Sequence, residues 1–222
     1  MDNLIEVPIY RKQKKFYRSA YEENYTPWSQ GIPDRYVDGF LKQLARSKKI
    51  GRVLDLGCGD GRHSKRIAQL GGKSVGIDYQ FLPLKRARNS TPKPHLRKIL
   101  YVYGDVFNLP LQREVFDLVI DYGVFHHIRR KDTLPFIDLI LQMLRPGGHF
   151  ILSCFSTHFK HHDKEERTRN FLVHRNHYDR FSTTSELRKI FSPDFRILNI
   201  QEERNGNDGF FHLLMQKKRI ES

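Results

Sequence analysis

Short apolar runs alternate with longer amphipathic stretches through the middle of the chain. Apolar runs of this length, bounded by glycine or acidic residues, indicate strands, and strands that alternate with helical stretches indicate an α/β fold. Such runs lie at residues 53–56, 74–77, 99–103, 116–120 and 149–152. The pattern therefore predicts a strand–helix core over about residues 50–155.

The segments on either side of this core are patterned differently. Residues 11–47 predict helices interrupted at Pro27 and at 31–33, whereas residues 156–181 predict a polar insertion. A chain of 222 residues fits one domain. We expect three parts: a helical N-terminal lid or extension at 1–49, the core at 50–155, and an insertion with closing strands at 156–222.

The C-terminal part begins with a marked helix start. Ser182, Thr183 and Thr184 are capping residues, and Glu186 is available in the first turn, so a helix is predicted at 184–191. Two strand-like runs follow at 195–201 and 210–216, joined by a polar turn that contains Gly206 and Gly209. They predict a closing hairpin.

The composition fits a soluble globular protein, with 38% hydrophobic and 29% charged residues. No stretch approaches the ~18 consecutive apolar residues of a membrane span, so no membrane partner is expected. Residues 1–6 lack the pattern of a signal peptide. The two cysteines, Cys58 and Cys154, both lie in the presumed sheet region, which argues against a disulfide framework. A cytoplasmic location is therefore predicted.

The formal charge of +14 changes the picture of possible partners. Basic residues cluster at 11–18 and again at 85–98. Such a surface favours nucleic acids, phosphorylated substrates or acidic proteins, although the same charge also keeps a protein soluble. For the second cluster, solubility is the favoured interpretation.

Residues 53–61, V-L-D-L-G-C-G-D-G, carry the strongest functional signal. Glycine is needed where the backbone turns tightly or approaches a ligand closely. A strand that runs through such a loop into a helix forms the nucleotide-binding corner of a doubly wound sheet. Arg62 stands where the dinucleotide fingerprint needs glycine, and no Lys-Ser/Thr pair follows Gly61. Both the dinucleotide fingerprint and the phosphate loop are therefore excluded.

Acidic residues end the next two strand-like runs. Asp78 and Asp105 could each be a helix N-cap, since aspartate is favoured there. Ligands of open α/β sheets bind outside the carboxyl ends of the strands. The recurrence of an acid at successive strand ends therefore favours ligand binding.

These blocks, taken in order, resemble the class I S-adenosylmethionine-dependent methyltransferases. The resemblance implies a Rossmann-like, doubly wound, mostly parallel seven-stranded sheet with an antiparallel last strand, and S-adenosyl-L-methionine as cofactor. It implies that Asp78 accepts from the ribose hydroxyls, that Tyr79 faces the adenine, and that Asp105 and Val106 contact its edge. The other cofactor-binding residues implied are Asp55, Gly57, Cys58, Gly59, Gly61, Gly104, Asp121 and Tyr122.

The end of the fourth strand bears on the acceptor. Methyltransferases of nucleobase or glutamine amino groups carry Asn/Asp/Ser-Pro-Pro-aromatic there, whereas this chain has D-Y-G-V at 121–124. The segment V-F-H-H-I that follows resembles the small-molecule branch of the family. Tyr122, His126 and His127 are the candidate catalytic residues. Either histidine suits a general base because its unperturbed pKa is near 6.5, the other being structural.

Two further segments are candidates for the acceptor pocket. Tyr25 and Trp28 precede the core in an aromatic segment similar to that of tellurite-resistance and thiopurine-type methyltransferases, where it forms a lid. The alternative is a helix that packs on the sheet. In the insertion, His177, Tyr178 and Arg180 are predicted on the acceptor side. The other histidines there lack the spacing of a metal motif, so no metal site is predicted.

The sequence therefore predicts a methyltransferase that acts on a small-molecule acceptor at oxygen, nitrogen or sulfur. One alternative is a methyltransferase for RNA or another anionic macromolecule, which the charge favours. A second alternative is a non-catalytic partner subunit that keeps the cofactor fold.

Overall fold

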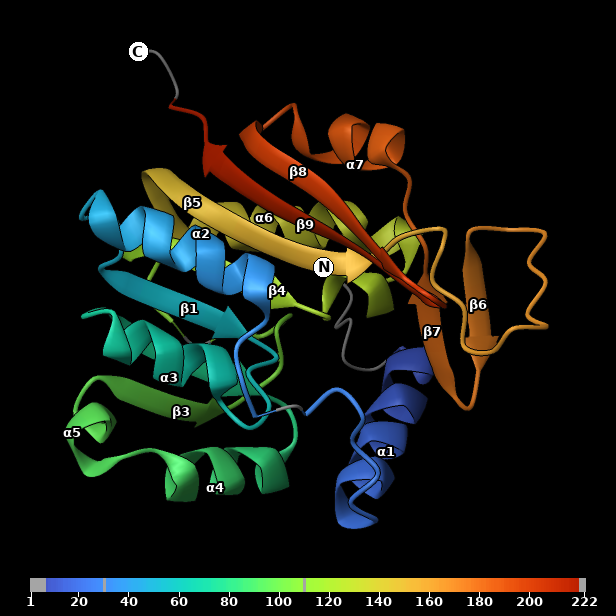
Figure 1. Ribbon diagram of the computed structural model, residues 1–222, viewed down its shortest axis with the longest axis horizontal. Coiled ribbons are helices and arrows are strands. Elements are labelled where there is room, and N and C mark those ends of the chain that lie inside the picture. Colours follow the sequence, from blue (N-terminus) through green and yellow to red (C-terminus); the bar gives the residue numbers. More distant parts are fainter. Residues whose placement is uncertain (1–6, 30, 110, 220–222) are drawn as a thin grey trace.

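The computed structural model describes residues 7–29, 31–109 and 111–219; residues 1–6, on which the signal-peptide prediction rests, lie outside them. Its centre is a seven-stranded sheet with the strand order β3-β2-β1-β4-β5-β9-β8 (Figure 1). The strands are β1 Arg52–Leu56, β2 Lys73–Asp78, β3 Ile99–Tyr103, β4 Phe116–Tyr122, β5 Leu144–Phe155, β8 Phe195–Asn205 and β9 Asp208–Lys217. β9 is antiparallel to both neighbours and the other neighbouring strands are parallel. The predicted sheet, with its antiparallel last strand, is confirmed.

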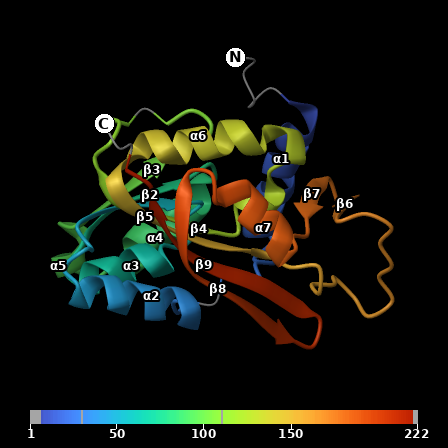
Figure 2. The same ribbon diagram turned by 90° about the horizontal axis from the view of Figure 1, so that it is seen from above.

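Helices cover both faces of this sheet (Figure 2). Because side chains alternate along a strand, Val53 packs with α2 (Arg35–Arg46) and α3 (Arg62–Gln69), while Leu54 packs with α6 (Thr133–Met143) and α7 (Thr184–Phe191). α4 (Phe81–Ser90) and α5 (Lys93–Leu96) lie beside β2 and β3 and carry the second basic cluster. Two 3-10 helices, η2 (Phe125–His127) and η3 (Arg130–Asp132), follow β4.

The predicted N-terminal extension is two separate helices. α1 (Pro8–Glu22) ends well before α2, and the backbone between them carries Pro27 and Pro33, which lack the N–H that a continuous helix requires. Figure 1 shows α1 beyond the carboxyl ends of the strands, apart from the helices that cover the sheet. Among the described residues, no helix is both long and apolar enough to cross a membrane.

The C-terminal elements follow the prediction closely. Helix α7 has the predicted bounds, and the Thr183 hydroxyl accepts a hydrogen bond from the Glu186 backbone N–H (3.1 Å). The closing hairpin is longer than predicted, because Asn205 pairs with Asp208 and leaves a two-residue turn. Gly206, with a φ of +58°, occupies that turn, whereas Gly209 lies inside β9.

The polar insertion contains a hairpin that its pattern did not predict. β6 (Phe171–His174) and β7 (His177–Arg180) pair in antiparallel fashion around Arg175 and Asn176. Both turn residues have a positive φ (45° and 65°), as a two-residue turn with the strand twist requires. Figure 1 shows this hairpin next to α1, beyond the end of the sheet.

Candidate active site

A cavity of about 880 Å³ lies at the carboxyl ends of the strands. The loop after β1, the residues that end β2 and β4, and the segment after β3 form its base, while α1 and the β6–β7 hairpin cover it. This is where open α/β sheets bind their ligands. Of the predicted residues, the cavity is lined by Tyr25, Trp28, Gly57, Cys58, Gly59, Asp78, Tyr79, Asp105, Val106, Tyr122, His126, His127 and His177.

The loop after β1 needs glycine at two positions on the cavity. Gly57 and Gly59 have φ values of +61° and +52°, which side chains rarely adopt. A Cβ atom on Gly57 would lie 2.5 Å from a methyl group of Val124, and one on Gly59 would lie 3.2 Å from the Tyr21 hydroxyl. At these two positions the loop therefore presents backbone atoms, without side chains, to the cavity.

Asp78 joins this loop to the end of β2. Its carboxylate accepts hydrogen bonds from the backbone N–H groups of Gly59 (3.0 Å) and Gln80 (2.8 Å). Burial raises the pKa of Asp78 to about 6; the two N–H groups oppose the rise, and the nearby carboxylates of Asp55 and Asp60 add to it. Each carboxylate oxygen has further acceptor capacity beyond these bonds, so Asp78 can still accept from a ligand.

Four residues predicted to bind the cofactor do not line the cavity. Asp55 is buried and accepts from the Ser64 hydroxyl (2.6 Å). Asp121 is buried and accepts from the backbone N–H groups of Val124 (2.7 Å) and Phe125 (2.9 Å), so it holds the start of η2. Gly61 is the N-cap of α3, and Gly104 donates its backbone N–H to the Asp78 carbonyl (3.0 Å). The contacts of all four residues are with the protein backbone or with a neighbouring side chain, and they hold the elements around the cavity in place.

Helix α1 turns one aromatic face to the cavity. Tyr10, Tyr17 and Tyr21 recur at helical spacing and all line it, as do Gln13 and Lys14 between them. The Trp28 indole N–H donates to the Tyr21 hydroxyl (3.1 Å), and the Trp28 ring meets the Tyr17 ring edge-on (5.3 Å between centroids). The aromatic segment and α1 therefore form a single wall.

The helix is tied to the core at several points. The Tyr10 hydroxyl donates to the Asp132 carboxylate (2.7 Å), and the Gln80 side-chain amide donates to the Lys14 carbonyl (2.7 Å). Near the C-terminus of α1, the Arg86 guanidinium donates to the Tyr21 carbonyl (3.0 Å). α1 thus crosses the cavity as a docked cover.

The two adjacent histidines differ in their surroundings. His126 is buried, stacks on Phe155 (3.7 Å between centroids) and accepts from the Phe155 backbone N–H (3.3 Å). Burial holds its pKa well below the ordinary value. His127 Nε2 lies 2.5 Å from the Tyr17 hydroxyl, and His127 Nδ1 lies 2.8 Å from Asp179 Oδ1. His127 therefore has the contacts of a positioned base, and His126 those of a structural residue.

Strand alternation on β7 separates the predicted acceptor-side residues. His177 and Asp179 line the cavity, whereas Tyr178 and Arg180, one residue on from each, do not. The Tyr178 ring stacks on Phe171 (5.7 Å). The Arg180 guanidinium is buried and donates to the Thr133 hydroxyl (2.8 Å) and to Glu186 (2.7 Å). The contacts of Tyr178 and Arg180 are those of structural residues.

Several cavity residues are not among those predicted from the sequence, and Tyr17, Asp60 and Asp179 are three of them. Tyr17 was not distinguished from the other aromatic residues of the N-terminal segment, although its spacing from Tyr10 and Tyr21 is helical. Asp60 lines the cavity, and its Oδ1 atom is buried without a hydrogen-bond partner among the described residues. Asp179 is two residues after His177, so the two side chains would share one face of a strand, and this spacing is a signal in the sequence that Asp179 belongs to the site.

Known proteins resemble this chain most clearly in its core. Residues 54–152 match the family described as a methyltransferase domain. A 2-heptyl-1-hydroxyquinolin-4(1H)-one methyltransferase from Mycobacteroides abscessus is 26% identical over 129 residues, which are 58% of this chain and 56% of that protein. A probable tRNA methyltransferase 9B from Homo sapiens is 30% identical over 157 residues, which are 69% of this chain and 32% of that protein. The chain spans between 29% and 59% of the length of such curated relatives.

The fold as a whole has a solved counterpart. The crystal structure of a 1,6-didemethyltoxoflavin-N1-methyltransferase from Burkholderia thailandensis, with bound 1,6-didemethyltoxoflavin and S-adenosylhomocysteine, superposes with a TM-score of 0.76. The match covers 98% of this chain and 93% of that one at 20% sequence identity. The likeness therefore includes α1 and the closing strands as well as the core.

Proposed function

Since the chain belongs to the class I S-adenosylmethionine-dependent methyltransferases, we propose that it transfers a methyl group from S-adenosylmethionine to a small-molecule acceptor. The docking of helix α1 over the cavity is the observation that favours a small-molecule acceptor. The helix lies across the cavity and is held by contacts at both of its ends, to Asp132 and to Arg86. A covered cavity of about 880 Å³ suits a cofactor and a small ligand better than a polymer.

The residues at the base of the cavity fit the cofactor. The bare backbone at Gly57 and Gly59 leaves room that a side chain would fill. The Asp78 carboxylate is the proposed acceptor for the ribose hydroxyls, with Tyr79 and Asp105 towards the adenine. The unpartnered Asp60 Oδ1 is a ready acceptor for the cofactor's ammonium group.

The chain's own contribution to the reaction is positioning, exclusion of water and removal of a proton. S-adenosylmethionine, when bound, would supply a methyl group on a sulfonium sulfur, and the neutral thioether that remains is a good leaving group. Tyr17, Tyr21 and Trp28 present aromatic rings at the cavity, which attract a cation and keep water away. We assign His127 as the general base that takes the acceptor's proton. The Tyr17 hydroxyl and the Tyr178 backbone carbonyl hold its ring, and the Asp179 carboxylate lies beside it.

RNA is the second candidate acceptor, because the charge is +14 and one relative is a probable tRNA methyltransferase. The purified protein is to be incubated with methyl-labelled S-adenosylmethionine and two separate extracts, one of small molecules and one of total RNA. We expect label in the small-molecule extract. Label in RNA alone, with binding that weakens steeply as salt rises, would overturn the acceptor class but not the methyl transfer.

The raised pKa of Asp78 predicts how cofactor affinity depends on pH. An ionised carboxylate accepts from both ribose hydroxyls, and protonation replaces an acceptor by a donor. With a pKa of about 6, Asp78 is ionised at pH 7.5 and mostly protonated at pH 5, so affinity falls as pH falls. Calorimetric titration with S-adenosylmethionine is expected to show binding about tenfold weaker at pH 5 than at pH 7.5.

Two variants test whether the pH dependence of cofactor affinity comes from Asp78 or from Asp55. Asp78→Asn is expected to bind more weakly by about 1–3 kcal/mol at pH 7.5 and to lose the pH dependence. Asp55→Asn is the matched control, because burial also raises the Asp55 pKa to about 6 but this side chain does not line the cavity. If Asp55→Asn removed the pH dependence and Asp78→Asn kept it, the ribose assignment would be wrong.

A further inference from the structure

The β6–β7 hairpin brings three chemically related side chains to one face. His174 pairs directly opposite His177 across the turn, and Asp179 lies two residues beyond His177 on the same strand. Because strand side chains alternate, these three point to one side, the side of the cavity. The loop before the hairpin adds His161, which also lines the cavity.

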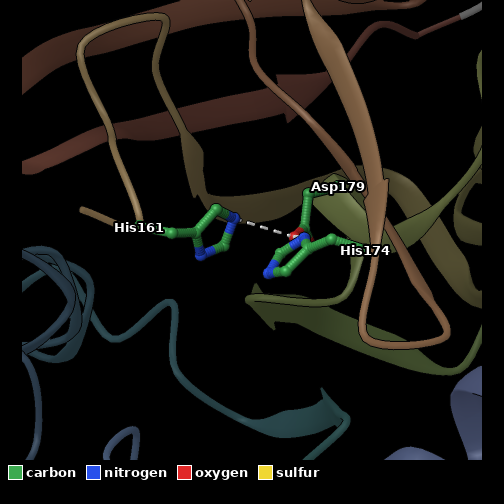
Figure 3. Close-up of side chains that lie close together, drawn as sticks. All are labelled: His161, His174 and Asp179. Carbon is green, nitrogen blue, oxygen red and sulfur yellow. Dashed lines mark ion pairs between the residues drawn. The ribbon is translucent and has the colours of Figure 1, made fainter. Parts of the chain in front are cut away.

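His161 and His174 lie close to the Asp179 carboxylate (Figure 3). Asp179 Oδ2 lies 3.1 Å from His161 Nε2 and 3.5 Å from His174 Nδ1. His177 Nε2 lies 3.1 Å from the same oxygen, while the other oxygen, Oδ1, faces His127. The donor atoms of His161, His174 and Asp179 all lie within 4.8 Å of one another.

Two of the three distances between these atoms match those between ligands of one metal ion. Donors held tetrahedrally at about 2.0–2.1 Å from a zinc ion lie about 3.3 Å apart. The two distances from Asp179 Oδ2, 3.1 and 3.5 Å, bracket that value. The set of two imidazoles and one carboxylate is a known ligand set for divalent transition metals with open coordination positions.

The Asp179 carboxylate has ring nitrogens close to it, but no hydrogen bond of good geometry within the part of the chain that the structure describes. Asp179 is fully buried, yet neither of its carboxylate oxygens has a partner with hydrogen-bond geometry among the described residues. His174 Nδ1 is buried too and makes no hydrogen bond to any residue that the structure describes. Buried charges in proteins are paired in good geometry or coordinate metals. A buried carboxylate that ring nitrogens approach without hydrogen-bond geometry has the arrangement expected of metal ligands.

We propose that His161, His174 and Asp179 bind a divalent transition-metal ion such as Zn²⁺ at the wall of the cavity, with His177 beside it. The ion neutralises the buried carboxylate and has its open coordination positions towards the cavity. This site differs from the expectation, drawn from the sequence, that the insertion holds no metal. The spacing of the histidines does not indicate the site, because the carboxylate that completes it, Asp179, lies in β7 and not among the acidic residues of the preceding loop.

A second group of possible ligands does not compete with this assignment. Asp34, Glu203 and His212 also lie close together. However, Asp34 accepts from the backbone N–H groups of Tyr36 and Val37 as the cap of α2, and Glu203 pairs with Arg35. Those carboxylates already have partners, whereas the Asp179 carboxylate has no hydrogen bond of good geometry from any described residue.

Metal binding can be measured on the whole chain without cofactor or acceptor, so its failure is separate from failure of the proposed function. The protein is stripped with a chelator, dialysed and titrated with ZnCl₂ by calorimetry. We expect one saturable site, and a loss of affinity above about tenfold in His161→Ala, His174→Ala and Asp179→Asn, since even outer-shell changes cost about 10–100-fold. His162→Ala and His158→Ala, exposed histidines of the same loop outside the group, are the matched controls and should bind as the wild type does.

A spectroscopic readout tests the geometry. Co²⁺ in the Zn²⁺ site of the wild type is expected to give the visible absorption bands of a four- or five-coordinate ion, and His174→Ala should lose them. Circular dichroism establishes that each variant is folded. Zinc binding that is equal in wild type and His174→Ala, or that is lost equally in His158→Ala, would show adventitious surface binding and overturn the site.

Discussion

Gly59→Val is expected to abolish the binding of S-adenosylmethionine while leaving the chain folded. Gly59 lies in the left-handed region with a φ of +52° and lines the cavity, so a branched side chain both strains the loop and occupies the ligand's space. Its Cβ atom would already lie 3.2 Å from the Tyr21 hydroxyl, which narrows the gap between the loop and α1. Calorimetric titration should show affinity reduced by more than about 100-fold, roughly 2.7 kcal/mol.

Gly71→Val is the control that distinguishes the effect of backbone strain from the effect of filling the cavity. Gly71 also has a positive φ (+94°), but a Cβ there meets no atom within 4 Å, and the residue lies between α3 and β2, away from the cavity. This variant should lose about 1–3 kcal/mol of unfolding free energy to strain, measured by denaturant titration, and keep wild-type cofactor affinity. Unchanged affinity in Gly59→Val would remove the loop from the cofactor site.

His127→Gln is expected to lower kcat by about 10²–10⁴-fold, the usual contribution of a positioned general base, with cofactor affinity unchanged. Glutamine keeps a polar group near the Tyr17 hydroxyl and Asp179 but cannot carry the acceptor's proton at neutral pH. The measurement is steady-state kinetics with an acceptor identified in the extract experiment.

His126→Gln is the matched control for that substitution. It removes the stacking on Phe155 and the bond to the Phe155 N–H, so it should cost stability. Its kcat should change by less than about tenfold, because burial keeps the pKa of His126 far below the range in which it could take up a proton. A large loss of kcat in His126→Gln together with near-normal kcat in His127→Gln would reverse the assignment.

The parts of the site that could be predicted from sequence are those that local chemistry determines. The positive φ values at Gly57 and Gly59 require glycine, and Asp78 stands at a strand end where the sheet topology puts ligands. Asp121 also lies in a strand that leads to the site, but its carboxylate accepts from the Val124 and Phe125 backbone N–H groups and does not line the cavity. Residue type and strand position alone do not distinguish these two orientations.

The acceptor side could be predicted only in part, because its geometry depends on a short hairpin in a polar segment. Tyr178 and Arg180 were selected from sequence, and strand alternation turns both away from the cavity while it turns His177 and Asp179 towards it. A shift of one residue in the register of this strand exchanges the two sets. Without the pairing partner β6, nothing in residues 177–180 fixes which set faces the ligand.

The docking of α1 has a consequence for the order in which the protein matures. This helix precedes in the chain every segment that holds it: Gln80 and Arg86, then Asp132, and finally the β7 strand at His177. Chains generally fold from the N-terminal side during synthesis, so α1 emerges long before its docking surface exists. A nascent chain that has already formed the glycine loop still has an open cavity, and the pocket is completed only when nearly the whole sequence has left the ribosome.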